Sequence, residues 1–180
     1  MKFQVNINEN DYYEFNIFHA LKSPYGEKNI RSSRIIIAVL GVIAALLILV
    51  FHGFTKDAVI YIIPLVAVIV ILEILWKRII LSGIKETLKQ LKKKGKMAYS
   101  PYAELEFSEN SFTEITEEEK TERKYSSIER ISIVENKYIY IHTNNLAAVI
   151  MPMNTFTGKE QYDEFVELLK GLNVEINYYT

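Results

Sequence analysis

Two long apolar runs dominate the pattern of hydrophobic and polar positions along the chain. The first covers residues 35–54 and contains no charged residue, and the second covers residues 58–81, with Glu73 as its one acidic residue. Twenty helical residues at about 1.5 Å per residue match a hydrocarbon core of about 30 Å. The pattern therefore predicts a two-helix transmembrane hairpin with a short polar break at residues 55–57.

The chain before the first run changes its period once. Residues 2–7 alternate between polar and apolar, which is typical of a short strand that must pair with a sheet elsewhere in the chain. Residues 8–21 follow helical spacing, with Asn8 or Asn10 as the N-cap, and residues 23–26 break the helix. The aromatic side chains of this amphipathic helix suit either the headgroup region of a membrane or packing on a folded domain.

The chain after the second run predicts a helix, a group of strands and a final helix. The membrane helix is expected to continue as a basic amphipathic helix through Lys96, with Gly95 as its stop. Six short strands follow, at residues 102–107, 112–116, 121–125, 128–133, 138–142 and 146–151. A helix then begins at Gly158 with Thr157 as its cap.

Strands in sequence followed by one helix indicate an α+β protein, in which a strongly bent antiparallel sheet or partial barrel is closed by the C-terminal helix. Four segments are expected. They are an N-terminal strand and amphipathic helix (1–34), the transmembrane hairpin (35–81), a basic amphipathic helix and linker (82–101), and a β-domain with its C-terminal helix (102–180).

Basic residues near the ends of the two runs predict the orientation in the membrane. Arg31 and Arg34 precede the first run and Lys77 and Arg78 end the second, whereas Lys56 is the one basic residue between them apart from a histidine. Lysine and arginine near span ends favour the cytoplasmic side. We therefore expect a multi-pass protein of the cytoplasmic (inner) membrane with both termini in the cytoplasm. The first 30 residues lack the pattern of a cleavable signal peptide.

A formal net charge of only −1 conceals a strong asymmetry. Residues 77–96 contain eight basic and one acidic residue, whereas residues 97–180 contain fifteen acidic and seven basic residues. Basic side chains near an anionic leaflet are attracted to it, so a membrane-surface contact is predicted, with enforcement of topology as the alternative. The predicted contact residues are Lys77, Arg78, Lys85, Lys89, Lys92 and Lys93. Nucleic acid is not an expected partner, because the acidic segment repels phosphate.

Three parts of the chain resemble the YcxB-like family of small bacterial membrane proteins. They are the aromatic and acidic stretch 10–19, the paired spans, and the run from Tyr125 through residues 138–141 to Pro152, followed by Phe156 and Phe165. The resemblance covers nearly the whole chain. It implies a pleckstrin-homology-like fold for the β-domain, and it implies no established activity and no catalytic residue.

The ionisable residues predict neither a catalytic nor a metal site. There is no cysteine, and His19, His52 and His142 lie in different predicted elements. The sequence has no glycine-rich phosphate loop and no nucleophile elbow, so no enzyme activity and no cofactor are expected.

Two residues within the second span have alternative interpretations. Glu73 is either an interfacial anchor that pairs with Lys77, or an intramembrane group used for a proton relay or for pairing in an oligomer. Pro64 predicts a kink, which serves either packing or gating.

The leading hypothesis is a non-enzymatic integral membrane protein that displays a cytoplasmic pleckstrin-homology-like domain for protein interaction or regulation. Its expected partners are the lipid bilayer and a protein of unknown identity. The alternatives are a small oligomeric transport or immunity-type membrane component, in which the hairpin is the working part, and a lipid-sensing module.

Overall fold

The computed structural model describes residues 1–95, 99–145 and 147–180. The expected helix end at Lys96 and strand start at Leu146 therefore lie outside the described residues. The α+β chain divides into two compact units, one of residues 1–15 with 91–180 and one of residues 16–90. This division differs from the four expected segments, because the N-terminal strand pairs with strands from the C-terminal part of the chain.

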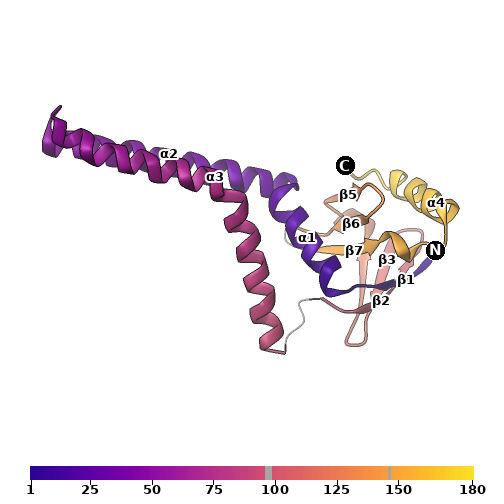
Figure 1. The fold of residues 1–180 in the computed structure, drawn as a ribbon. Helices are drawn as coiled ribbons and strands as arrows, with labels where there is room; N and C mark the ends of the chain where they lie inside the picture. The colour runs from indigo at the N-terminus through magenta and orange to yellow at the C-terminus, as the bar shows by residue number, and fades with distance from the viewer. Residues whose placement is uncertain (96–98, 146) are drawn as a thin grey trace. The chain divides into compact units, whose positions relative to one another are not determined.

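The first unit contains two four-stranded sheets (Figure 1). The first sheet is antiparallel, and Phe3 of β1 lies opposite Leu105 of β2, while Val5 lies opposite Ala103. The prediction that the N-terminal strand pairs with a C-terminal strand is therefore confirmed. In spatial order the strands of this sheet are β1 (Lys2–Asn6), β2 (Tyr102–Phe107), β3 (Ser111–Ile115) and β4 (Lys120–Lys124).

The second sheet is mixed. In spatial order its strands are β7 (Ala148–Pro152), β6 (Tyr138–His142), β5 (Arg130–Val134) and β8 (Ile176–Tyr179). The two pairings from β7 to β5 are antiparallel, as expected, but β8 runs parallel to β5. The sequence pattern does not predict a strand at residues 176–179. Its parallel pairing with β5 needs a crossover connection, and α4 (Lys159–Lys170) is part of that connection.

An apolar core joins the two sheets to α4. Phe165 of α4 is fully buried, and its ring centroid lies 4.8 Å from that of Phe3 and 4.9 Å from that of Phe107. Figure 1 accordingly shows the N-terminus beside α4. The predicted capping role of Thr157 is wrong, because Gly158 is the N-cap and the side chain of Gln161 accepts hydrogen bonds from Thr157 instead.

The second unit is dominated by a helical hairpin of α2 (Pro24–His52) and α3 (Lys56–Lys93). The helix before it, α1 (Glu9–Leu21), begins in the first unit and ends in this one. Helix α2 begins well before the expected span, because Ser23 accepts a hydrogen bond from the backbone N–H of Gly26 and so caps the helix, with proline in its first turn. Residues 23–26 therefore end the run of α1, as the predicted helix break requires, and they also form the start of α2.

Helix α3 contains the second span and most of the expected basic helix without interruption. The helical assignment continues through Pro64. Figure 1 shows α2 and α3 side by side, with α3 bending away from α2 toward its C-terminal end.

Both hairpin helices are long and apolar enough to cross a membrane. Their large apolar side chains are largely exposed, up to 79% for Phe51. A continuous exposed apolar surface of this kind is unfavourable in water, whereas helices satisfy their own backbone hydrogen bonds in lipid. The composition of the two helices therefore agrees with the predicted hairpin.

Candidate functional site

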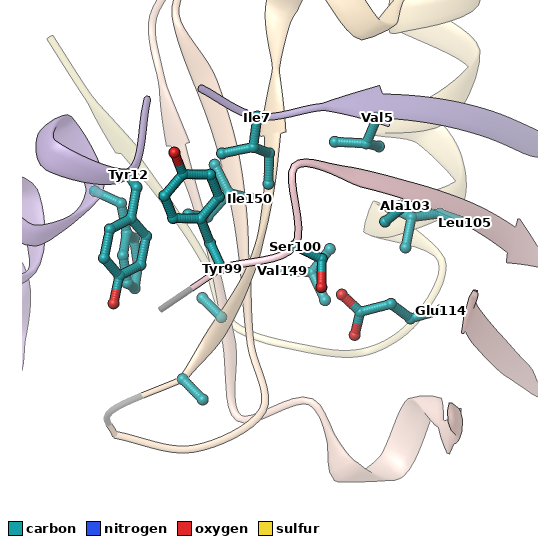
Figure 2. Close-up of a pocket in the computed structure, with 13 residues that line it drawn as sticks. Val5, Ile7, Tyr12, Tyr99, Ser100, Ala103, Leu105, Glu114, Val149 and Ile150 are labelled. Carbon is teal, nitrogen blue, oxygen red and sulfur yellow. The ribbon is translucent and has the colours of Figure 1, made fainter. Parts of the chain in front are cut away.

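A pocket of about 240 Å³ opens in the first unit, between β1 and β2 of one sheet and β7 of the other (Figure 2). Small side chains create the space. Ala103 of β2 faces inward, where the next inward residue of the same strand is Leu105. Ala148 begins β7, and Ala147 directly precedes it. Large side chains fill the space between the two sheets in other places. Beside these alanines a hollow remains, and we call it the sheet pocket.

Polar groups enter the sheet pocket from two sides. Figure 2 shows Tyr12 and Tyr99 on one side and Glu114 on the other. The two tyrosine rings are stacked, with centroids 5.0 Å apart, and burial raises the pKa of Tyr99. Glu114 accepts a hydrogen bond of 2.8 Å from the guanidinium of Arg123, so its charge is compensated at the pocket wall.

The start of α1 positions the aromatic side of this pocket. Asn8 accepts hydrogen bonds from the backbone N–H groups of Asn10 and Asp11, while the Asp11 carboxylate accepts one from the N–H of Asn8. This reciprocal capping confirms Asn8 as the N-cap, one of the two expected. The other carboxylate oxygen of Asp11 accepts a 2.9 Å hydrogen bond from Tyr138 of β6.

The N-terminal part of α1 therefore packs on the folded domain, which is one of the two interpretations given for this helix. Phe15 is only 6% exposed, and its ring lies 5.2 Å from that of Tyr140. Burial, followed by the contact with Asp11, raises the pKa of Tyr138, so its hydroxyl remains a donor to that carboxylate. Nothing in the local sequence marks this bond, because its partners are 127 positions apart.

A second group of buried polar side chains lies on β5 and β6. Arg130, Ser132 and His142 are at most 8% exposed. Because a guanidinium can only donate, the contact of 3.4 Å between Arg130 and Nδ1 of His142 assigns that nitrogen as the acceptor. Nε2 then carries the proton and donates to Ser132 Oγ at 3.1 Å. These contacts pair several polar groups inside the unit, whereas Nε of Arg130 is buried with no hydrogen-bond partner among the described residues.

The other two histidines lie elsewhere in the fold. His19 stacks on Tyr25 at 5.4 Å, and His52 stacks on Tyr61 at 5.0 Å. Among residues 1–95, 99–145 and 147–180, no cluster of histidine and carboxylate side chains has the arrangement of a metal site.

Glu73 forms an ion pair that differs from the expected one. Its carboxylate lies 3.0 Å from Nε of Arg34 on the neighbouring helix, whereas the sequence interpretation pairs it with Lys77 on its own helix. The antiparallel hairpin brings the start of one span beside the end of the other. The pairing of Glu73 with Arg34 could therefore have been inferred from the positions of the charged residues in the sequence. Pro64 lies within α3, away from this ion pair in sequence.

The predicted membrane-surface residues are distributed along the C-terminal part of α3. Lys77, Arg78, Lys85, Lys89 and Lys93 are all exposed. Lys92 is exposed too, but its ammonium group lies 2.6 Å from the carboxylate of Glu9, and this bond raises the pKa of Lys92. Lys92 is therefore paired with a carboxylate of the same chain, and its contact with the membrane surface stays a prediction.

Comparison with known proteins identifies part of the first unit. No match was found among characterised proteins or among solved structures. Residues 107–169 match the family model described as YcxB-like protein, from the last residue of β2 into α4. This part of the first unit is therefore similar to the YcxB-like family.

Proposed function

We propose that the protein is a non-enzymatic integral membrane protein that holds its first unit at the cytoplasmic surface, where this unit binds a protein partner. The observation that carries the proposal is the sheet pocket. Its described lining residues combine apolar side chains with Tyr12, Tyr99, Ser100 and Glu114, a combination suited to binding an apolar side chain with a few directed polar contacts. None of these described lining residues is a histidine, lysine or arginine, and the carboxylate of Glu114 is paired with Arg123, so the pocket lacks the usual serine–histidine pairing.

The arrangement of the first unit supports a pleckstrin-homology-like assignment. Strands β1 to β4 form one sheet, β5 to β7 form the antiparallel part of the other, and α4 follows them. This agrees with the fold that the YcxB-like resemblance implies, with β8 as an additional strand.

Charge favours a particular kind of partner segment. Residues 97–180 have a formal net charge of −8, from fifteen acidic and seven basic residues. Complementary charge increases association rates and suppresses wrong partners. The proposed partner segment therefore has an apolar side chain for the sheet pocket and basic residues beside it.

Cross-linking in native membranes tests this proposal. The wild-type chain should capture a discrete partner, and Ala148→Leu should reduce its recovery at least tenfold because the larger side chain fills the sheet pocket. Thr121→Leu is the matched control, since it adds a similar side chain to β4 outside the pocket lining. Recovery of the chain alone, or equal loss of partner in both variants at equal thermal stability, would contradict the proposal.

A small oligomeric transport or immunity-type component is the second candidate, and the ion pair of Glu73 with Arg34 favours it. Ionisable groups within membrane helices are costly and are often functional. Glu73→Gln should then change the oligomers seen by cross-linking while leaving capture of a partner by the first unit intact. An unchanged oligomer pattern would leave the ion pair with the role of an interfacial anchor. Lipid sensing by the first unit is less favoured, because its acidic residues repel an anionic leaflet.

A further inference from the structure

The junction of α1 and α2 is a tightly built elbow. The Ser23 hydroxyl is fully buried, donates a 2.6 Å hydrogen bond to the carbonyl of His19, and accepts one from the N–H of Gly26 at 3.0 Å. A Cβ atom on Gly26 would lie 2.3 Å from that same carbonyl oxygen. The end of α1 and the first turn of α2 therefore have one fixed arrangement.

A pocket of about 320 Å³ lies between this elbow and α3, and we call it the elbow pocket. Three small residues, Ala20, Gly26 and Ser33, lie on one side, and Trp76 and Ile80 of α3 line the other. Most of the lining surface is apolar. The elbow pocket belongs entirely to the second unit and is separate from the sheet pocket.

The elbow pocket contains a polar atom that requires a partner. The indole Nε1 of Trp76 is buried and has no hydrogen-bond acceptor among the described residues. Buried polar groups in proteins are nearly always hydrogen-bonded, so this N–H needs an acceptor, and Trp76 itself is part of the lining of the elbow pocket.

The sequence around the elbow pocket places it at one end of the apolar hairpin. Ser33 precedes Arg34, and Trp76 lies one turn after Glu73, so the Arg34–Glu73 ion pair is the immediate neighbour of the pocket. Lys77 and Arg78 follow Trp76 directly and are exposed. Tryptophan followed by basic residues is typical of the membrane–water interface, where the apolar ring and the polar N–H both find suitable surroundings.

We propose that the elbow pocket binds one glycerophospholipid of the cytoplasmic leaflet. An ester carbonyl of the lipid accepts the hydrogen bond of Trp76 Nε1, its acyl chains follow the exposed apolar side chains of the hairpin, and its phosphate lies toward Lys77 and Arg78. This site rests on the membrane insertion in the proposed function, but it is independent of what the sheet pocket binds.

Native mass spectrometry of the full chain, released from membranes in mild detergent, tests for the bound lipid. The wild-type chain should retain about one phospholipid per chain. Ser33→Leu fills the elbow pocket and should lower retention at least tenfold, whereas Ser32→Leu, the adjacent and exposed residue outside the lining, should retain the lipid. Trp76→Phe removes the N–H but keeps an aromatic ring, and should lower retention severalfold.

The single tryptophan of the chain allows a second measurement, in which the purified chain is returned to a lipid bilayer. In vesicles of phosphatidylglycerol and phosphatidylethanolamine with brominated acyl chains, fluorescence of Trp76 should be strongly quenched in the wild type and in Ser32→Leu, and less in Ser33→Leu. Equal quenching and equal lipid retention in the two serine variants, at equal helix content, would overturn the lipid site. Extraction of the wild-type chain by alkaline carbonate would instead overturn membrane insertion, so the two failures are distinguishable.

Discussion

At the scale of single residues, Gly26 is a position where neighbouring backbone atoms leave no room for a side chain. An alanine Cβ there would lie 2.3 Å from the carbonyl oxygen of His19 and 2.6 Å from backbone atoms of Ala20. These atoms belong to the last turns of α1 and cannot turn aside as a flexible side chain could. We therefore expect Gly26→Ala to destabilise the second unit by about 1–3 kcal/mol, the usual range for overpacking.

Gly83 supplies the matched control, because it is also helical and a Cβ there would meet nothing within 4 Å. Gly83→Ala should leave stability unchanged or raise it by up to about 1 kcal/mol, the difference in helix propensity. Thermal unfolding of both variants in the same detergent measures the difference. Equal midpoints for the two variants would show that α1 and α2 do not approach each other as described.

Tyr138 links stability to pH at the same scale. Its pKa is raised in the folded chain, whereas an unfolded tyrosine ionises near pH 10. The unfolded state therefore loses its proton first, so the contribution of Tyr138 to stability is complete below about pH 10 and falls as pH rises further.

Tyr138→Phe should lower the free energy of unfolding by about 1–3 kcal/mol at pH 7, because Asp11 loses its buried donor. The same substitution should make the loss of stability at alkaline pH shallower. Urea unfolding at pH 7 and 10.5 measures both effects, with the exposed Tyr102→Phe as the control.

At the scale of elements, local patterns predict the strands that pair with sequence neighbours. The bounds of β2 and β6 are predicted fully, because apolar residues alternate along β2, tyrosine and isoleucine fill β6, and turn residues flank both strands. Strand β8 is missed because its parallel pairing with β5 depends on the path of α4, which no local pattern contains. The position of α1 is likewise decided by a contact between Asp11 and Tyr138, which are distant in sequence.

The candidate sites are predicted less well than the elements, for the same reason. Ala103 and Ala148 are unremarkable in the sequence and define a pocket only after the two sheets meet. Trp76 is recognisable as an interfacial residue, but no local pattern indicates that its N–H is buried or that the residue lines the elbow pocket. Charge pattern alone does anticipate that Glu73 needs a partner, although the hairpin supplies Arg34 in place of Lys77.

Helix packing within the hairpin yields a prediction at Gly41. A Cβ atom there would lie 2.4 Å from Cδ1 of Ile69, which is the end of a flexible side chain. Gly41→Ala should therefore be tolerated, whereas Gly41→Leu should separate α2 and α3 and lower the thermal midpoint. Adding Ile69→Ala should restore most of the loss, since it removes the side chain that obstructs the leucine. Failure of the double variant to recover would place the close approach elsewhere along the hairpin.

At the scale of the whole molecule, the predicted topology places the turn between α2 and α3 outside the cytoplasm. Phe54 in this turn is 95% exposed, and Glu118 lies in the exposed turn between β3 and β4. The chain has no cysteine, so Phe54→Cys and Glu118→Cys each introduce a single reactive thiol.

Because basic residues cluster at the other end of the hairpin, a membrane-impermeant maleimide on intact cells should label position 54 and leave position 118 unlabelled. Position 118 should react once the cells are permeabilised. Labelling of position 118 alone in intact cells would reverse the orientation, and would move both the elbow pocket and the sheet pocket away from the cytoplasmic leaflet and the proposed partner.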